Sequence, residues 1–190
     1  MDADCFVALD FETADTGRDS ACSIALVRAE RGRIVHRSKR LIRPPRREFQ
    51  FTYIHGISWE HVADEPVFAK VWPELAPILN GVEFVAAHNA SFDHGVLEAC
   101  CDAARLPMPE TPFLCTVKLA RNVWHLYPTK LPDVCRHLRI PLQHHDALSD
   151  AEACAKIVLA ARQGGSRATA TGPLRGGVAS ACARGRPRSP

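Results

Sequence analysis

The stretch DCFVALDFET, residues 4–13, joins a short apolar run to two acidic residues near the start of a 190-residue chain. The run is rich in strand-forming residues, and the polar residues that follow favour a buried strand over a helix. Side chains alternate along a strand, so Asp10 and Glu12 are expected on one face of the sheet. Two neighbouring carboxylates repel each other and are costly to desolvate, and a hard divalent cation compensates them. Taken alone, the two acids fit an exposed strand end equally well.

A second apolar run, VEFVAA at 82–87, leads into the polar segment HNASFD at 88–93. From Ser91 onward apolar residues recur at helical spacing, which predicts a helix over 91–105 with Ser91 as its N-cap. Asp93 then lies in the first turn of this helix. The simplest role for an acid at that place is to complement the helix dipole. A role in a site depends on the other segments.

The third segment, HHDALSDAEACAKIVL at 144–159, begins with polar residues and continues as an alanine-rich amphipathic pattern. Its composition predicts a helix over 147–162. Asp150 falls on the apolar stripe that is expected to pack inward, where a carboxylate needs a partner. His145 precedes it by five residues and can reach the same place from the loop or the first turn. A histidine beside another histidine is, however, most often a surface or capping residue.

Read in order, LDFET, HNASFD and H-x-A-x-x-D match the three motifs of the DEDDh group of 3′–5′ exonucleases. This group includes the proofreading epsilon subunit of bacterial DNA polymerase III, and exonuclease X. The resemblance covers about residues 4–162, and YIHGI at 53–57 and CTVKLAR at 115–121 support it. The second of these segments is especially similar to exonuclease X. The resemblance implies an α/β protein of ribonuclease H-like fold, with a mixed five-stranded sheet flanked by helices.

The resemblance also implies the residues of an active site. Two divalent ions, Mg²⁺ or Mn²⁺, would be held by four carboxylates, those of Asp10, Glu12, Asp93 and Asp150. Oxygen ligands of this kind favour hard ions over zinc. As general base, His145 would accept a proton from the attacking water when it is neutral, above the usual imidazole pKa of about 6.5.

Contacts to the terminal nucleotide and the scissile strand are implied for five further residues, namely Phe11, Thr13, His55, Asn89 and Phe92. The two phenylalanines are equally well explained as core residues near the site. If they stack on bases, they would do so without regard to sequence, which suits an enzyme that moves along any strand.

The expected activity is metal-dependent hydrolysis of phosphodiester bonds from the 3′ end of DNA, with single-stranded or frayed ends as substrates and nucleoside 5′-monophosphates as products. The chain shows no apolar docking segment like that of epsilon, which favours a stand-alone enzyme of DNA repair or replication over a dedicated polymerase subunit. Two alternatives stay open. An exoribonuclease of the same fold differs in contacts to the 2′-hydroxyl, which residue spacing does not reveal. A non-catalytic nucleic-acid-binding module is expected to lack at least one motif residue, and none is missing.

Composition fits one domain followed by a tail. The chain is 46% hydrophobic, which supports a core for one exonuclease domain at residues 1–162. Residues 163–190 are rich in Gly, Pro, Ser and Arg and are predicted to be disordered, with arginines able to add nonspecific affinity for nucleic acid. The net charge of +3 depends on six arginines after residue 161, and without them it is −3. An acidic domain of this kind needs its metal ions before it accepts a phosphate backbone.

The remaining features limit location and partners. The sequence shows no signal peptide and no apolar stretch near the ~20 residues that span a membrane, so we expect a cytoplasmic protein without a membrane partner. The eight cysteines form no C-x-x-C pair and are expected to be reduced thiols. Basic clusters at 37–47 and around Arg121 are candidates to guide a nucleic-acid strand, or are solvated faces. Further strands are expected near 20–28 and 33–42, and further helices near 67–80, 116–126 and 131–138.

Overall fold

The structure, a computed structural model, describes residues 4–170. Within them five strands form one sheet in the order β3-β2-β1-β4-β5. The strands are β1 (Cys5–Thr13), β2 (Ala21–Glu30), β3 (Arg33–Leu41), β4 (Val85–Ala87) and β5 (Phe113–Cys115). The pairs β1–β2 and β2–β3 are antiparallel, whereas β1–β4 and β4–β5 are parallel. The predicted mixed five-stranded sheet is therefore confirmed.

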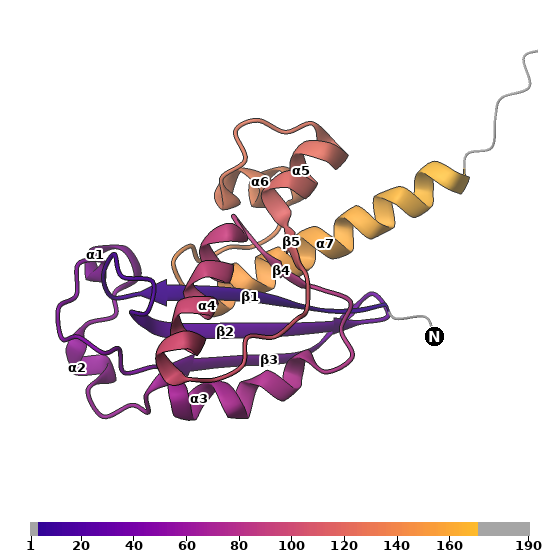
Figure 1. Ribbon diagram of the computed structural model, residues 1–190. Coiled ribbons are helices and arrows are strands. Elements are labelled where there is room, and N and C mark those ends of the chain that lie inside the picture. The colour runs from indigo at the N-terminus through magenta and orange to yellow at the C-terminus, as the bar shows by residue number, and fades with distance from the viewer. Residues whose placement is uncertain (1–3, 171–190) are drawn as a thin grey trace, which may run out of the picture.

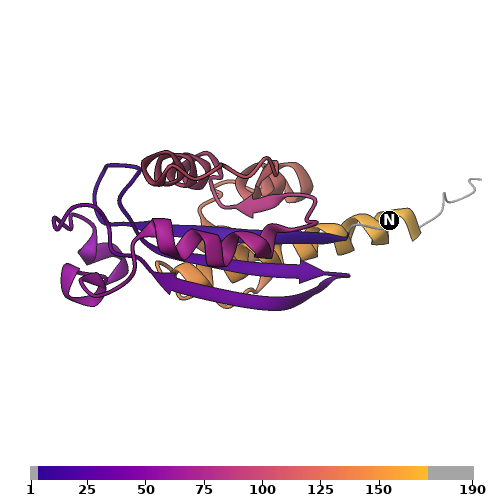
Figure 2. The ribbon, with the colours of Figure 1, turned by 60° about the horizontal axis from the view of Figure 1, so that its bottom comes forward.

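Helices cover both faces of this sheet (Figures 1 and 2). The α-helices in the described residues are α1 (Thr52–His55), α2 (Trp59–Val62), α3 (Phe68–Leu75), α4 (Ser91–Ala104), α5 (Thr116–Trp124), α6 (Leu131–Leu138) and α7 (Ala147–Ala170). A short 3₁₀ helix, Ala76–Leu79, follows α3. Helices α3 and α4 pack on one face, and α7 packs on the other with α5 and α6 beside it. No helix among residues 4–170 is both long and apolar enough to cross a membrane.

Strand β1 lies in the centre of the sheet, and its side chains alternate between two buried cores. Phe6 and Ala8 face the core under α7, whereas Val7 and Leu9 face the core under α3 and α4. All four side chains are at most 1% exposed, and apolar burial of this kind is the main source of stability. Because residues two apart on a strand share a face, Asp10 continues the series on the α7 side.

The turn before α4 differs from the prediction. Helix α4 begins at Ser91, but its N-cap position is Ala90 and no side chain caps it. The Ser91 hydroxyl donates instead to the Asn89 side chain, at 3.4 Å. Asn89 has a left-handed backbone with φ of 65°, which asparagine tolerates better than most residues. The predicted Ser91 cap is wrong because Asn89 makes the turn from β4 into the helix.

Helix α7 continues to Ala170, past the end predicted at residue 162. Once a helix has started, each further residue adds a hydrogen bond at low cost, so α7 continues through Gly164 and Gly165 although glycine is a poor helix former. The boundary drawn at 162 therefore falls inside α7. The tail predicted at 163–190 overlaps this helix and then, for residues 171–190, lies outside the described residues. Its disorder stays a prediction.

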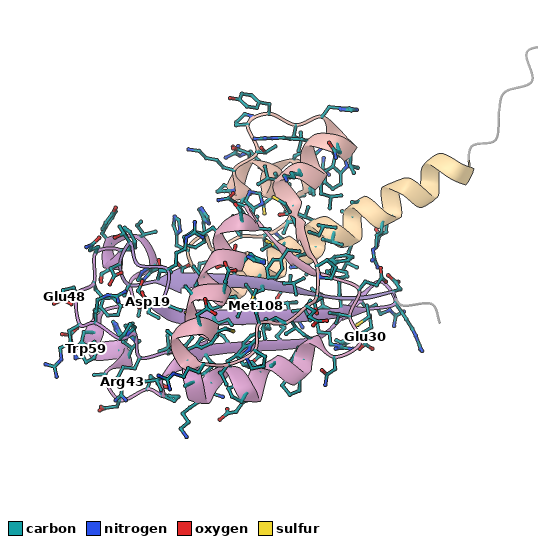
Figure 3. The ribbon with its side chains drawn as sticks, in the orientation of Figure 1. Asp19, Glu30, Arg43, Glu48, Trp59 and Met108 are labelled. Atoms are coloured by element: carbon teal, nitrogen blue, oxygen red, sulfur yellow. The ribbon has the colours of Figure 1, made fainter. Side chains whose placement is uncertain are left out.

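Three short elements were not predicted individually. They are β5, with three residues, and α1 and α2, with four residues each. Such elements span too few positions for a period to be recognised. Helices α1 and α2 lie at the end of the sheet where β1 ends (Figure 1). Figure 3 shows Glu48 and Trp59 at that end, and Glu30 at the opposite end beside the turn between β2 and β3.

Candidate active site

Three carboxylates meet on the α7 side of β1, close to the end of the strand. Asp10 and Glu12 come from β1, and Asp150 comes from the first turn of α7. One oxygen from each of the three lies within 4.8 Å of the others. Asp150 is only 4% exposed, and the two acids of β1 are half-buried. The predicted common face of Asp10 and Glu12 is confirmed.

Asp93 reaches the same end of the sheet from the first turn of α4. Its side chain is 2% exposed, and its Oδ1 accepts a hydrogen bond from the backbone N–H of Phe11, at 3.1 Å. β1 pairs with β4 only at Val7 and Ala8, so the N–H of Phe11 has no partner in β4 and bonds to Asp93 instead. This bond fixes Asp93 beside the acids of β1, in a role beyond the helix dipole.

The pKa of each of the four carboxyls is raised, with burial as the largest cause. For Asp10 and Glu12, the repulsion of neighbouring carboxylates raises the pKa further, in the case of Glu12 to about 8. The pKa of Asp93 also rises to about 8, although its hydrogen bonds oppose the rise. That of Asp150 rises less, because hydrogen bonds and two neighbouring histidines favour its charged form. Four acids at one place are unfavourable until positive charge compensates them.

Asp150 is held through only one of its two oxygens. Its Oδ2 accepts a hydrogen bond from the backbone N–H of His145 at 3.2 Å and lies 2.9 Å from Nδ1 of His144. Its Oδ1 is buried and has no hydrogen-bond partner among the described residues. A buried carboxylate oxygen without a partner is rare and costly. Because Asp150 groups with Asp10 and Glu12, this carboxylate fits a bound divalent cation.

His145 lies at the entrance to this cluster. Its backbone is left-handed, with φ of 69°, and its exposed ring stacks on that of His144 with centroids 3.8 Å apart. Partial desolvation and the neighbouring His144 lower the pKa of His145. The imidazole is therefore neutral at neutral pH and able to accept a proton. The structure thus brings together the predicted histidine and all four predicted acids. His144 was not predicted, and its only signal was its place beside His145.

A hollow of about 210 Å³ lies beside Glu12. Its lining contains four of the five residues implied as substrate contacts. These are Phe11, Thr13, His55 and Phe92, joined by Phe51 and Ile54. Phe92 is 39% exposed, so its ring is accessible to a ligand. Phe11 is only 4% exposed and is chiefly a core residue that also forms part of the wall.

Both ring nitrogens of His55 are bonded to the backbone. Nε2 donates to the carbonyl of Thr13 at 3.1 Å, and Nδ1 accepts from the N–H of Ile57 at 3.0 Å. We assign this tautomer because a carbonyl oxygen can only accept. Burial lowers the pKa of His55, in agreement with a neutral ring. His55 therefore ties the turn after α1 to the end of β1, and its nitrogens have no capacity left for a ligand.

A larger hollow, of about 540 Å³, opens beside Asp10 and Asp150. Asn89, the fifth implied contact, lines it together with two basic residues, Arg121 and Lys130. The acidic cluster therefore lies between an apolar hollow and one with a basic lining.

His88 holds one wall of this larger hollow and was not predicted as a site residue. Its Nε2 donates to the carbonyl of Thr129 at 3.0 Å, and its Nδ1 accepts from the hydroxyl of Thr116 at 2.8 Å. Thr129 in turn accepts a hydrogen bond from Arg121 through its hydroxyl, at 3.0 Å. These bonds fix the segment before α6, which carries Lys130. The available signal was the place of His88 at the start of HNASFD.

Most of the basic cluster at 37–47 is paired with acids of the protein itself. The ion pairs are Arg37–Glu152, Lys39–Asp146, Arg40–Glu74 and those of Arg46 with Asp15 and Asp19. The first two connect β3 to the region of α7 that carries Asp150. The cluster therefore serves the fold, and the hypothesis that it guides a nucleic-acid strand finds no support.

Asp146 fixes the beginning of α7 and also was not predicted. Its Oδ1 accepts hydrogen bonds from the N–H groups of Leu148 and Ser149, both at 3.0 Å, as in an N-cap. Its Oδ2 pairs with Lys39 of β3 at 2.5 Å. The signal was available, because an acid directly before a helix start is typical of an N-cap. Asp146 thus orients the helical turn that presents Asp150.

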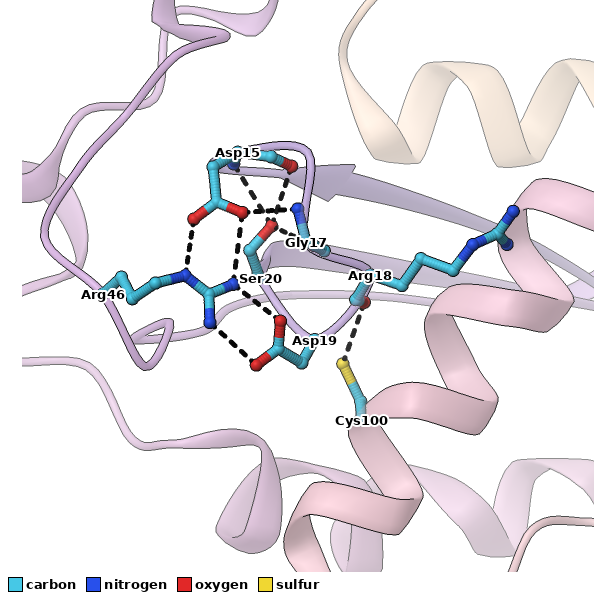
Figure 4. A network of polar contacts seen from close by, with 7 residues as sticks. All are labelled: Asp15, Gly17, Arg18, Asp19, Ser20, Arg46 and Cys100. Carbon is cyan, nitrogen blue, oxygen red and sulfur yellow. Dashed lines mark hydrogen bonds and ion pairs between the residues drawn. The ribbon is translucent and has the colours of Figure 1, made fainter.

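A second polar network fixes the loop that follows β1 (Figure 4). The guanidinium of Arg46 donates to both oxygens of Asp15, at 2.8 and 3.1 Å, and to both oxygens of Asp19, at 2.9 and 2.6 Å. These bonds lower the pKa of both acids. Ser20 closes the loop by donating to the carbonyl of Gly17 at 2.6 Å. The end of β1, where the acids project, is therefore held rigidly.

A family model for exonucleases of the RNase T type matches residues 7–158, a span that includes every acid and histidine of the cluster. The chain belongs to the RNase T exonuclease family. This membership confirms the resemblance to the DEDDh exonucleases and identifies the protein as a member of a family of nuclease hydrolases.

Individual relatives agree with this assignment. DNA polymerase III PolC-type of Thermotoga maritima is 32% identical over 158 residues, which are 81% of this chain and 12% of that protein. Exodeoxyribonuclease 10 of Escherichia coli is 36% identical over 149 residues, or 72% of this chain and 59% of that protein. A solved structure of exonuclease X with 5′ overhanging duplex DNA is 30% identical with a TM-score of 0.69, and covers 83% of this chain and 91% of that chain. The chain therefore spans less than two thirds of these curated relatives, and its ribonuclease H-like fold is confirmed.

Proposed function

We propose that this protein is a two-metal 3′–5′ exonuclease that hydrolyses phosphodiester bonds at the 3′ end of DNA and releases nucleoside 5′-monophosphates. The observation that carries the proposal is the buried Oδ1 of Asp150, which has no hydrogen-bond partner within residues 4–170, in a residue that groups with Asp10 and Glu12. Such an oxygen is costly unless a cation binds it. The all-oxygen donor set supports Mg²⁺ or Mn²⁺ as that cation.

In this proposal the four carboxylates of Asp10, Glu12, Asp93 and Asp150 hold two divalent ions. When bound, the ions supply positive charge to the attacking and leaving oxygens of an in-line displacement. His145 takes a proton from the attacking water at a ring nitrogen that is unprotonated at neutral pH. Asp150 also orients this base, because its Oδ2 holds the backbone N–H of His145.

The two hollows suggest how a strand is bound. The apolar hollow beside Glu12 receives the terminal nucleotide, and the exposed ring of Phe92 stacks on its base without regard to sequence. Thr13 lines the same hollow. The larger hollow receives the adjoining backbone, where Lys130 and Asn89 contact its phosphates. A single strand or a frayed end fits these two hollows best, because its terminal base is unpaired and can move away from the stacked bases next to it.

DNA is proposed as the substrate because exodeoxyribonuclease 10 is a relative and exonuclease X has been solved with DNA. The match to exodeoxyribonuclease 10 also favours a stand-alone role in DNA repair or replication, although polymerase proteins carry related domains. A cytoplasmic location forms part of the proposal. Cell fractionation tests the location, and affinity capture from cell extract tests for a polymerase partner.

The decisive experiment is a gel assay of the purified protein on 5′-labelled single-stranded DNA and RNA of the same sequence, with Mg²⁺ or Mn²⁺. We expect a ladder that shortens from the 3′ end, faster on DNA, and no cleavage with EDTA or in Asp10→Ala. The exposed Asp102 of α4 gives a matched control, since Asp102→Ala should cleave like the wild type. Faster cleavage of RNA would show an exoribonuclease. Absence of cleavage with both metals, or full activity of Asp10→Ala, would overturn the proposal.

A further inference from the structure

His144, His145 and Asp150 form a second group of ligand atoms at the edge of the carboxylate cluster. One nitrogen from each histidine and one carboxylate oxygen lie within 4.8 Å of one another. This group shares only Asp150 with the group formed with Asp10 and Glu12. Two imidazoles and one carboxylate are a typical zinc ligand set and suit magnesium poorly. We propose that His144, His145 and Asp150 bind Zn²⁺, and that this ion inhibits the exonuclease.

The spacing of the first two ligand atoms already fits such an ion. Nδ1 of His144 lies 2.9 Å from Oδ2 of Asp150. Zinc binds nitrogen and carboxylate oxygen at about 2.0–2.2 Å, so two ligands at angles between 90° and the tetrahedral value lie about 2.8–3.5 Å apart. A zinc ion bound to both atoms lies to one side of the line that joins them, so it can replace this hydrogen bond after a turn of the exposed His144 ring. The proton that Nδ1 carried then moves through solvent to Nε2 of the same ring, so the imidazole stays neutral and Nδ1 offers its lone pair to the metal.

The third ligand needs a small adjustment that the structure permits. The rings of His144 and His145 are stacked at 3.8 Å with an angle of 23° between their planes, so their nitrogens lie in adjacent layers. Both side chains are exposed, and rotation of an exposed ring is fast and costs little. The same exposure gives an ion in solution direct access to the site. A water molecule can complete a tetrahedral set, as in zinc sites with three protein ligands.

The two oxygens of Asp150 lie in different surroundings. Oδ2 faces the histidines, whereas Oδ1 is buried without a hydrogen-bond partner among the described residues. Oδ1 therefore stays available to the carboxylate group when Oδ2 binds zinc. Excess Mg²⁺ does not compete for the imidazoles, because magnesium prefers oxygen ligands and keeps several of its waters. The histidine group should thus bind zinc while magnesium is present.

Inhibition follows from the use of His145 as a ligand, and this part rests on the proposed function. A ring nitrogen that coordinates zinc cannot accept a proton from water. Zinc at this group therefore removes the proposed general base without displacing the carboxylates of β1.

The test is a titration with Co²⁺ as a spectroscopic substitute for zinc, followed by displacement with Zn²⁺, in excess Mg²⁺ at pH 7.5. The wild type is expected to show visible absorption bands of nitrogen-coordinated Co²⁺, which Zn²⁺ abolishes. His144→Gln is expected to weaken binding at least about 10-fold. The exposed His36 of β3 gives the matched control, and His36→Gln should bind like the wild type. Asp10→Ala keeps the histidine group and should retain the bands.

The same variants are assayed for nuclease activity in Mg²⁺ with increasing Zn²⁺. The zinc concentration for half inhibition should follow the measured Kd and rise at least about 10-fold in His144→Gln. The proposed zinc site would be refuted if the wild type and His144→Gln bound Co²⁺ equally well while circular dichroism showed that both are folded. Binding without inhibition would overturn the inhibitory role. If the wild type has no activity in Mg²⁺ alone, the proposed function fails, whereas the Co²⁺ spectrum still decides the metal site.

Discussion

Replacing Glu12 by glutamine is expected to stabilise the metal-free protein at neutral pH and to remove exonuclease activity. Glu12 is half-buried beside Asp10 and Asp150, and burial and the neighbouring carboxylates raise its pKa from 4.5 to about 8. Glutamine has nearly the same shape and carries no charge. To fold at pH 7 the wild type must protonate Glu12, whereas glutamine is neutral at every pH, so the substitution removes this cost while leaving the packing in place.

The sign of the pH dependence follows from the direction of the shift. The folded state binds the Glu12 proton more tightly than the unfolded state does. Its stabilising contribution is therefore complete below pH 4.5 and is lost as the pH rises toward 8. A fully shifted group loses about 1.4 kcal/mol per pH unit within this window. Because Glu12 is partly exposed, solvent screening reduces this, and we expect about 1–2 kcal/mol between pH 5 and pH 7. For a chain of this size, that difference changes the Tm by about 2–8 °C.

Thermal unfolding followed by circular dichroism in EDTA, at pH 5, 6, 7 and 8, measures this effect. The wild type should lose stability over the range, and Glu12→Gln should lose less and melt higher at pH 7. Glu98→Gln, at an exposed position of α4, is the control and should follow the wild type. Saturating Mg²⁺ should raise the Tm of the wild type at pH 7 more than that of Glu12→Gln. Equal pH slopes in EDTA, or a lower Tm of Glu12→Gln at pH 7, would refute the reasoning.

Three further substitutions test other parts of the structure. In Gly17→Ala the new Cβ would lie 2.8 Å from Oδ1 of Asp19 and 2.9 Å from Oδ1 of Asp15. We therefore expect the free energy of unfolding, measured by chemical denaturation, to fall by about 1–3 kcal/mol. An unchanged denaturation midpoint would contradict this. Phe92→Ala should leave the free energy of unfolding within about 0.5 kcal/mol of the wild type, because the side chain is exposed. It should raise KM by about 5-fold or more, because stacking on the base is lost. An unaltered KM would exclude Phe92 from the substrate site. Asp146→Ala should lower the free energy of unfolding by about 1 kcal/mol, because the cap of α7 is lost. Asp146→Asn should lower it by much less, since asparagine also caps helices. Equal losses would show that Asp146 stabilises the fold mainly through its ion pair with Lys39.

Much of the fold followed from the sequence because the long elements carry clear periods. The alternation along β1 predicted which face holds Asp10 and Glu12, and the alanine-rich pattern of α7 predicted an inward Asp150. The shortest elements, β5, α1 and α2, were not predicted, since three or four residues do not define a period. The Ser91 cap was wrong because the left-handed conformation of Asn89 leaves little trace in the sequence.

The supporting residues of the site were harder to predict than the five motif residues. His88 and Asp146 act through partners far away in the sequence, and such contacts depend on how the helices pack on the sheet. His144 contacts Asp150, six residues later, but only because the loop before α7 folds back over the first turn of that helix. The basic cluster at 37–47 shows the converse. Its charge suggested a nucleic-acid surface, but its main partners, Glu152 and Glu74 among them, were visible only in three dimensions.

The hydrogen bond from the N–H of Phe11 to Asp93 gives the protein an internal reporter. An amide proton that points at a carboxylate changes its resonance frequency when that carboxylate gains a proton or a cation. In an ¹⁵N-labelled sample, the Phe11 cross-peak should therefore titrate with the carboxyl of Asp93, whose pKa is about 8 without metal. When Mg²⁺ is added, the Phe11 cross-peak should keep the position typical of deprotonated Asp93 down to a lower pH. One backbone signal in the central strand thus records both the protonation and the occupancy of the site, without any substrate.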